Sequence, residues 1–221
     1  MKKKRALLVI DVQNDFCAGG SIAVPDGDAV VPVVNALMSR GKYDLIILSQ
    51  DFHPADHGSF ASQHPGKKPF EMGKLNDQPQ MMWPDHCVQG SKGTEFHPDL
   101  LKSLANYIQQ KGTDKAADSY SAFRDNNAKT LTGLATYLKR QGIEELDVCG
   151  LATDYCVSLS ALDARGLLPG LKVSFIEDAS RGIDPADVET AKRKMKIAGI
   201  DIIKAAGRLP SPPTTKRRFG P

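Results

Sequence analysis

The chain has 221 residues, 41% of them hydrophobic and 25% charged, which is the balance of a single globular domain with a sizeable core. No apolar run reaches the roughly 18 residues of a membrane-spanning helix. Asp11 interrupts the short N-terminal run, so neither a membrane protein nor a signal peptide is expected. The net charge of +3 derives from basic residues near the two ends. The chain between them is mildly acidic, so a basic surface for binding nucleic acid is not expected there.

Six short apolar runs have the length and composition of buried strands. Val, Ile and Leu follow one another almost without interruption in most of them, which is typical of strands covered on both faces in a parallel sheet. They lie at residues 6–12, 43–50, 106–111, 146–151, 173–178 and 200–204.

Helical periodicity appears between these runs, at residues 28–40, 129–141, 154–166 and 185–198. Asp184 followed by Pro185 is typical of a helix start, because Asp caps the first turn and Pro suits the first helical position. Alternating strands and helices predict an α/β protein. We expect a three-layer α/β/α sandwich with a central, mainly parallel sheet of about six strands.

One domain is expected over residues 1–205, with an insertion at 52–98 that is rich in Pro and Gly and shows little periodicity. An irregular connection of this length is usually functional or disordered. It holds all five histidines of the chain, which argues against disorder alone. Residues 206–221 form a basic, Pro-rich tail that we expect to be extended, with a sorting or partner-binding role left open.

Three of the predicted strands end in a side chain that can do chemistry, and a fourth leads to a cysteine. Asp11, Asp51 and Lys111 end the first three strands, and Cys156 follows the fourth at the start of a helix. Ligands and catalysts in open parallel sheets sit beyond the carboxyl ends of the strands. We therefore expect these four side chains to lie close together.

Two interpretations of Cys156 are possible: it is a small core residue, or it is a nucleophile. A helix N-terminus favours the thiolate, and its backbone N–H groups could hold an oxyanion. Asp11 could then accept the thiol proton and return it to a leaving amine, with Asp15 as the neighbouring alternative. Lys111 taken alone would be a surface lysine, but its place at a strand end makes it the candidate cation beside the thiol.

Asp51 and His53 are two residues apart, so in extended backbone their side chains point the same way and could bind one metal ion. His86, from the insertion, could supply a third ligand. Three oxygen and nitrogen ligands with open positions suit Zn²⁺, Fe²⁺ or Mn²⁺ and leave room for water or substrate. His57 and His64 are further candidates that we do not assign.

Five longer motifs extend this pattern, in the order IDVQNDFCAGGSIAV, DFHPADHGSFASQH, WPDHCVQGSKG, DSYSAF and GLATDYCV. Together they resemble the nicotinamidase branch of the isochorismatase-like cysteine hydrolases, over roughly residues 5–205. The triad and the metal ligands that this resemblance implies coincide with the candidates above: Asp11, Lys111 and Cys156; Asp51, His53 and His86.

The resemblance also implies substrate contacts, which would fall on Phe16, Trp83, Tyr120, Ala152 and Tyr155. The backbone N–H groups of Ala152 and Cys156 would form the oxyanion hole, and the peptide bond before Ala152 would be cis. Without the resemblance, the first three of these contacts would be read as ordinary core residues.

The function implied by the resemblance is hydrolysis of nicotinamide to nicotinate and ammonia, in NAD salvage in the cytoplasm. A cysteine thioester would form while one divalent transition metal holds the pyridine ring, zinc being the first choice and iron or manganese the alternatives. The partner would be the small-molecule substrate, not nucleic acid or membrane, and homo-oligomer formation stays open. Two other functions are kept: a related amidase or isochorismatase-like hydrolase with another small substrate, and a non-enzymatic metal-binding or thiol-sensing protein.

Overall fold

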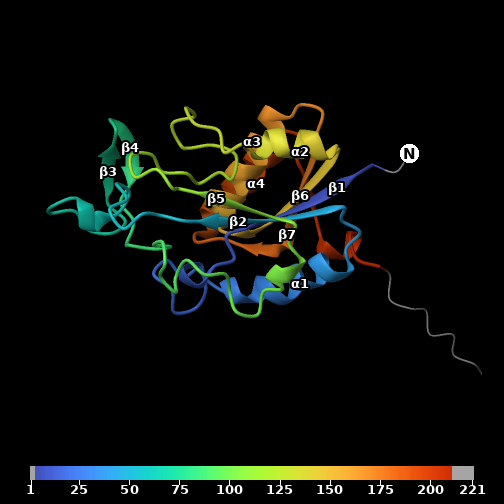
Figure 1. Ribbon diagram of the computed structural model, residues 1–221, viewed down its shortest axis with the longest axis horizontal. Coiled ribbons are helices and arrows are strands. Elements are labelled where there is room, and N and C mark those ends of the chain that lie inside the picture. Colours follow the sequence, from blue (N-terminus) through green and yellow to red (C-terminus); the bar gives the residue numbers. More distant parts are fainter. Residues whose placement is uncertain (1–2, 211–221) are drawn as a thin grey trace, which may run out of the picture.

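The computed structural model describes residues 3–210, so of the expected tail only residues 206–210 fall within the described part. Its centre is a six-stranded sheet in the order β5-β2-β1-β6-β7-β8, with every neighbouring pair parallel (Figure 1). The strands are β1 (Arg5–Ile10), β2 (Leu45–Asp51), β5 (Tyr107–Lys111), β6 (Glu145–Leu151), β7 (Lys172–Arg181) and β8 (Asp201–Ile203). The prediction of a parallel sheet of about six strands is confirmed.

Helices cover both faces of this sheet, as predicted for a three-layer sandwich (Figure 1). One face carries α1 (Val30–Arg40), and the other carries α2 (Leu134–Gln141), α3 (Ser158–Leu167) and α4 (Pro185–Ile197). In β1, Leu7 and Val9 pack in the core on the α1 side, whereas Leu8 and Ile10 pack in the core on the α3 side. Because both faces are buried, the strand reads as an uninterrupted apolar run.

Glycine and capping residues set the helix boundaries. The Asp184 carboxylate accepts hydrogen bonds from the Ala186 and Asp187 N–H groups at 2.7 and 3.2 Å and so starts α4 as predicted. The helix predicted over 129–141 begins only at Leu134. Gly133 precedes it with a φ of 90°, which favours glycine and breaks the helical path. The first part of that prediction was therefore wrong.

The connections contain several single helical turns that the sequence analysis did not find. A π-helical turn, η5 (Thr153–Val157), leads into α3 and replaces the first turn of the helix predicted at 154–166. The others are 3-10 turns: η1 (Asn14–Phe16), η2 (Gly27–Ala29), η3 (Ala61–Gln63), η4 (Lys102–Leu104) and η6 (Ala205–Gly207).

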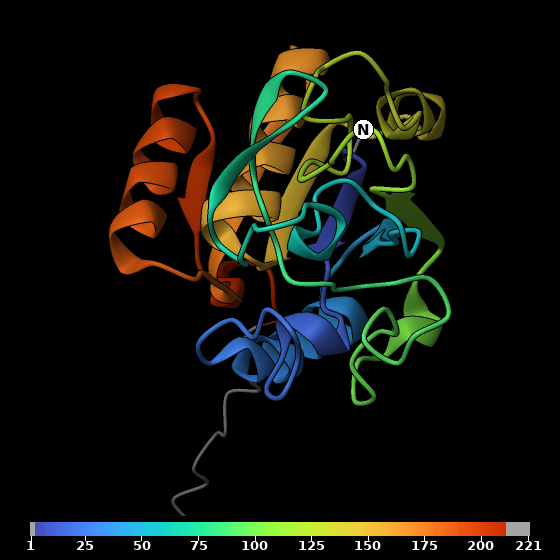
Figure 2. The same cartoon turned by 90° about the vertical axis from the view of Figure 1, so that its left-hand side faces the viewer.

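The insertion at 52–98 carries an antiparallel hairpin of its own, β3 (Met72–Leu75) and β4 (Gln78–Met81), which was also not predicted. Asn76 and Asp77 turn the chain with φ angles of 48° and 61°, as in a type I′ turn. Both strands are short and β4 reads QPQM, so neither shows apolar alternation. Figure 2 looks onto the end of the molecule where the hairpin lies in front of the sheet, so the insertion covers the carboxyl edge of the strands.

The last described residues pack against the sheet. Ala205 is buried, and the Arg208 guanidinium pairs with the buried Asp147 of β6, with Nη2 2.9 Å from Oδ1. The Tyr43 hydroxyl donates to the other oxygen of that carboxylate at 3.0 Å. Within residues 3–210, no helix has the length and apolarity to cross a membrane.

Candidate active site

Lys111 connects the candidate triad. Its ammonium Nζ lies 2.9 Å from Asp11 Oδ2 and 3.6 Å from Cys156 Sγ, and it donates to the Ser119 carbonyl at 3.0 Å. The side chain is completely buried, so the reading of Lys111 as a surface lysine is wrong. The three residues that were predicted to meet at the carboxyl edge do lie together.

Strand pairing explains how these side chains come together. In the parallel pair β2·β5, Asp51 stands directly opposite Lys111. Asp11 follows β1, the strand on the other side of β2, and Ser49 of β2 orients it. The Ser49 hydroxyl donates to Asp11 Oδ1 at 2.6 Å and accepts the Asp11 N–H at 3.2 Å.

Gln13 fastens the ends of β1 and β2 to each other. Its side-chain oxygen accepts the Asp51 N–H at 2.8 Å, and its amide nitrogen donates to the Asp51 carbonyl at 2.8 Å. The same nitrogen donates to the Thr94 carbonyl at 2.9 Å, so the insertion is held at this point as well. Ser49 and Gln13 were both missed by the sequence analysis, although Ser49 and Asp51 are two residues apart on one strand and therefore share a face.

Burial governs the charge state of the triad. Burial raises the pKa of Asp11 more than the nearby Lys111 lowers it, so this carboxylate is a stronger proton acceptor than an exposed one. Burial also raises the pKa of the Cys156 thiol well above its usual value, although Lys111 opposes the shift. Burial therefore opposes the preference for thiolate that the helix N-terminus was expected to give. For Lys111, burial lowers the pKa, but the two facing carboxylates outweigh it and hold the amine charged.

The candidate metal ligands meet beside the triad. Asp51 Oδ2 lies 3.1 Å from His53 Nε2 and 3.6 Å from His86 Nε2, and all three side chains are buried. His53 Nδ1 donates to the Gly112 carbonyl and His86 Nδ1 to the Pro84 carbonyl, each at 2.8 Å. These bonds place a ring proton on each Nδ1 and leave each Nε2 turned towards the carboxylate.

Two imidazole nitrogens and a carboxylate meet at a point that suits a cation. Among the described residues, His53 Nε2 is buried without a hydrogen-bond partner, while Asp51 Oδ1 faces the Lys111 ammonium at 3.1 Å. Burial lowers the pKa of His53, but the facing Asp51 carboxylate outweighs burial and raises it overall, which shows the same demand for positive charge. The three residues therefore fit a divalent transition metal with open coordination positions.

Of the remaining histidines, His64 and His97 have other partners, whereas His57 Nε2 is buried without a hydrogen-bond partner in the described part of the chain and lies in a second group of ligand atoms with His53 and Asp118. His57 Nδ1 is bonded to the Ser59 hydroxyl at 2.8 Å, and its ring lies 4.1 Å from the His53 ring. His64 Nε2 donates to the Gly58 carbonyl at 2.7 Å, which occupies the nitrogen that a metal would need. His97 lies apart from this centre and pairs with Asp28.

A pocket opens between the cysteine and the metal ligands. All five expected substrate contacts line it, together with Asp51, His86 and Cys156. Trp83 holds the aromatic wall together: its ring stands edge-on to Tyr155 and Tyr120 at 5.3 and 6.2 Å, and its N–H donates to the Tyr120 hydroxyl at 3.0 Å. The peptide bond before Ala152 is cis, as the resemblance implied.

Three lining residues escaped the sequence analysis: Ile22, Asp118 and Ile183. Both isoleucines lie in irregular segments without periodicity, so nothing in the sequence separates them from other loop residues. Asp118 opens the DSYSAF motif two residues before Tyr120, and that spacing could have identified it. Its carboxylate is buried and accepts a hydrogen bond from Gln80 Nε2 at 2.7 Å.

Comparison with known proteins agrees with this arrangement. The family model described as "Isochorismatase domain" matches residues 5–207. A curated nicotinamidase of Escherichia coli is 49% identical over 208 residues, covering 91% of this chain and 95% of that protein. The chain is also similar to a solved Acinetobacter baumanii nicotinamidase/pyrazinamidase, with 44% identity, a TM-score of 0.89 and coverage of 95% and 100% of the two chains.

Two further solved structures are similar to this chain and carry ligands. A protein of L. infantum in complex with nicotinate shares 36% identity with a TM-score of 0.81, covering 92% of this chain and 94% of its own. A pyrazinamidase of Pyrococcus horikoshii in complex with zinc shares 36% identity with a TM-score of 0.73, covering 91% of this chain and 99% of its own.

Proposed function

The chain belongs to the isochorismatase family, and from that membership and the geometry of its pocket we propose that it hydrolyses nicotinamide to nicotinate and ammonia. The observation that carries the proposal is the position of Cys156: its sulfur lies 3.6 Å from Lys111 Nζ, in a pocket that also borders Asp51 and His86. The nucleophile and two of the candidate metal ligands therefore face one small aromatic chamber, and the Lys111 cation lies against the sulfur. The E. coli relative with the same activity supports this assignment.

The first half of the reaction acylates the cysteine. Asp11 removes the thiol proton of Cys156 as its sulfur attacks the amide carbonyl carbon, while Lys111 offsets the negative charge shared by the carboxylate and the sulfur. The backbone N–H groups of Ala152 and Cys156 hold the oxyanion. The C–N bond then breaks, Asp11 returns the proton to the leaving nitrogen, and ammonia departs from a thioester.

The second half releases the acid. Asp11 removes a proton from a water molecule, whose oxygen attacks the thioester carbon. The C–S bond breaks, nicotinate leaves, and the proton held by Asp11 returns to the Cys156 sulfur. A buried carboxylate with a raised pKa suits both halves, because it must accept and release a proton in each.

Asp51, His53 and His86 would hold one divalent transition metal, with zinc as the first choice because of its occurrence in the P. horikoshii relative. When bound, the ion supplies a Lewis-acid contact for the pyridine nitrogen and so orients the ring. The chain's own side chains then complete the chamber, with Phe16, Trp83 and Tyr120 around the ring and Tyr155 beside the cysteine. Iron and manganese suit the same ligands.

This activity belongs to NAD salvage, and we place it in the cytoplasm, where reducing conditions match four cysteines without disulfide bonds. We take residues 1–205 as one catalytic domain with the tail as an appendage. The partner is the small substrate.

Ammonia release tests the proposal, with nicotinamide compared against benzamide, which has the same amide but no ring nitrogen. Wild type should release ammonia from nicotinamide rapidly and from benzamide slowly, and Cys156→Ala should release none from either. The matched control is Cys149→Ala, a buried cysteine of β6 outside the pocket, which should keep the substrate preference. Equal rates on both amides would contradict the ring anchor, and no activity on nicotinamide would point to another small amide.

A further inference from the structure

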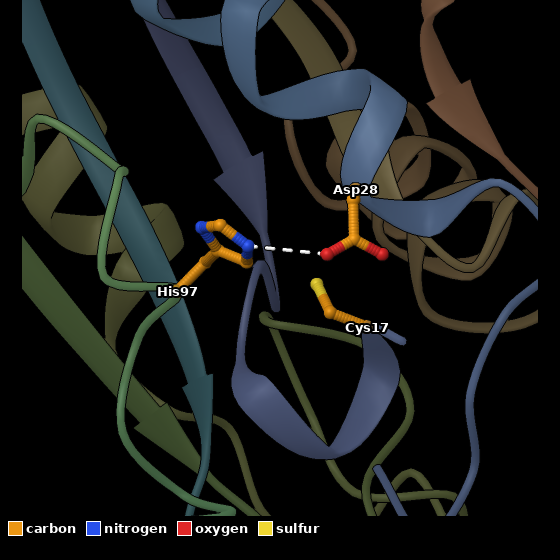
Figure 3. A group of neighbouring side chains, drawn as sticks. All are labelled: Cys17, Asp28 and His97. Carbon is orange, nitrogen blue, oxygen red and sulfur yellow. Dashed lines mark hydrogen bonds and ion pairs between the residues drawn. The ribbon is translucent and has the colours of Figure 1, made fainter. Parts of the chain in front are cut away.

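A second group of metal-ligating side chains lies outside the proposed active site. Cys17 follows η1, Asp28 belongs to η2, and His97 lies near the end of the insertion, yet the three meet (Figure 3). One ligand atom from each lies within 4.8 Å of the other two, and His97 Nε2 is 3.2 Å from Asp28 Oδ1. Two neighbouring turns and a segment distant from them in sequence thus present sulfur, oxygen and nitrogen to one point.

The Cys17 thiol is aimed at this point without a partner. The residue is 2% exposed, and its sulfur has no hydrogen bond to any residue between 3 and 210. Figure 3 shows the sulfur directed towards the Asp28 carboxylate and the His97 ring.

The Asp28 carboxylate contacts two of the neighbouring segments. The Ala18 N–H donates to its Oδ2 at 2.8 Å, which leaves Oδ1 turned towards His97. The Asp28 side chain is 45% exposed and borders, together with Cys17 and His97, a cleft of about 560 Å³ on the surface. The cleft offers an entry path and room for a water molecule as a further ligand.

We propose that Cys17, Asp28 and His97 form a second transition-metal site, separate from Asp51, His53 and His86. A mixed sulfur, nitrogen and oxygen set suits zinc and its congeners and not magnesium or calcium. Tetrahedral zinc with bonds of about 2.0–2.3 Å separates its ligand atoms by about 3.3–3.6 Å, and the nitrogen–oxygen distance of 3.2 Å is close to this range. Binding releases the Cys17 thiol proton to solvent as the metal–sulfur bond forms.

The ligands of the second site are less well arranged for metal binding than those of the first. His53 and His86 carry their ring protons on Nδ1, whereas His97 Nδ1 accepts the Asp99 N–H at 3.2 Å, which places its ring proton on Nε2. Metal binding must move that proton and give up the Asp99 hydrogen bond. The second ion should therefore bind more weakly than the first and load after it.

An ion at this position would brace the substrate pocket. Cys17 directly follows Phe16, which lines the pocket, and the His97 N–H donates to the Val12 carbonyl at 2.9 Å. The ion would tie η1 to η2 and to the His97 segment at the point where the chain leaves β1. This inference does not depend on the proposed reaction.

Cobalt titration of the full-length, metal-free protein tests the site, because a thiolate bound to Co²⁺ gives a sulfur-to-metal charge-transfer absorption that oxygen and nitrogen ligands do not. The wild type should develop this absorption as a second equivalent binds. Cys17→Ser should lose it, and His97→Gln should need at least about tenfold more cobalt for half-saturation. Since His97 is partly exposed, His97→Gln decides the question if Cys17→Ser does not fold.

Two sets of controls identify the sulfur and the site. Replacing each of the other three cysteines by Ala, one at a time, should leave the absorption intact. His86→Ala should lose one bound ion but keep the absorption, which separates this site from the first. Absence of the absorption in wild type carrying two cobalt ions, or its loss in Cys156→Ala or Cys87→Ala, would overturn the proposal.

Discussion

Lys111 Nζ lies 3.1 Å from Asp51 Oδ1, so the cation of the proposed triad also touches the carboxylate of the proposed metal centre. Both side chains are buried, and Asp11 completes the group on the other side of the ammonium. The catalytic and metal-binding halves of the pocket therefore share one network of charges, and a change in either half should be felt in the other.

Lys111→Met should destabilise the metal-free protein by about 3–5 kcal/mol, because it leaves two buried carboxylates without their cation. A bound zinc ion should recover part of this loss, since it places positive charge against Asp51. Urea unfolding with and without zinc measures both effects. Lys115→Met is the control, because its pair with Asp56 is exposed on both sides and should contribute almost nothing. Equal unfolding midpoints for Lys111→Met and wild type would refute the shared network.

His86→Ala should weaken zinc binding at the first site by at least about a hundredfold, because it removes a ligand whose ring is already oriented by the Pro84 carbonyl. The KM for nicotinamide should rise with it, whereas the slow reaction on benzamide should change much less, because benzamide has no ring nitrogen for the ion to hold. Isothermal titration and steady-state kinetics give the two numbers. His64→Ala, which removes a histidine bonded to backbone, should alter neither. A rise in KM for both amides would assign His86 to the pocket wall alone.

Tyr120→Phe should raise the KM for nicotinamide by roughly tenfold with little change in kcat. The ring stays, but the Trp83 N–H loses its acceptor, and an unsatisfied buried donor costs about 1–3 kcal/mol. Trp83 fluorescence should shift in the same variant. Tyr107→Phe, whose ring stacks on Tyr137 away from the pocket, is the matched control. An unchanged KM would mean that the hydrogen bond does not position the aromatic wall.

Glu177 should contribute a pH-dependent part of the stability. Hydrogen bonds from Lys192 and Lys204 lower its pKa to about 2 from 4.5. This contribution is fully present above pH 4.5 and is lost as the pH falls towards 2. Solvent screening limits it to about 1 kcal/mol. The midpoint temperature of thermal unfolding should therefore fall less steeply over this pH window in Glu177→Gln than in wild type. In Glu189→Gln it should follow the wild-type pH dependence.

The strand-end residues could be predicted because a parallel sheet leaves little freedom in where its strands finish. Asp51 and Lys111 each end a strand that reads as such in the sequence, and adjacent parallel strands then place the two side chains opposite each other. Cys156 follows the same logic after β6, the strand next to β1. What the pattern did not reveal is the burial of Lys111, which depends on carboxylates from two other strands.

The parts that were missed depend on irregular backbone. Ile22 and Ile183 reach the pocket from loops. Loops lack the regular spacing of apolar residues that predicts which way a side chain points in a helix or strand. The β3–β4 hairpin is set by the turn at Asn76 and Asp77, not by apolar alternation. Burial is the main cause of the raised pKa of the Cys156 thiol, and burial depends on tertiary packing that cannot be read from the motif around this residue.

The most direct test of the account is mass spectrometry of the protein quenched with acid during turnover of nicotinamide. The account predicts a nicotinoyl group on Cys156, absent from Cys156→Ala and found on no other cysteine, with ammonia released before nicotinate in a single turnover. Turnover of nicotinamide by Cys156→Ala, or simultaneous release of ammonia and nicotinate without any adduct, would contradict the covalent mechanism.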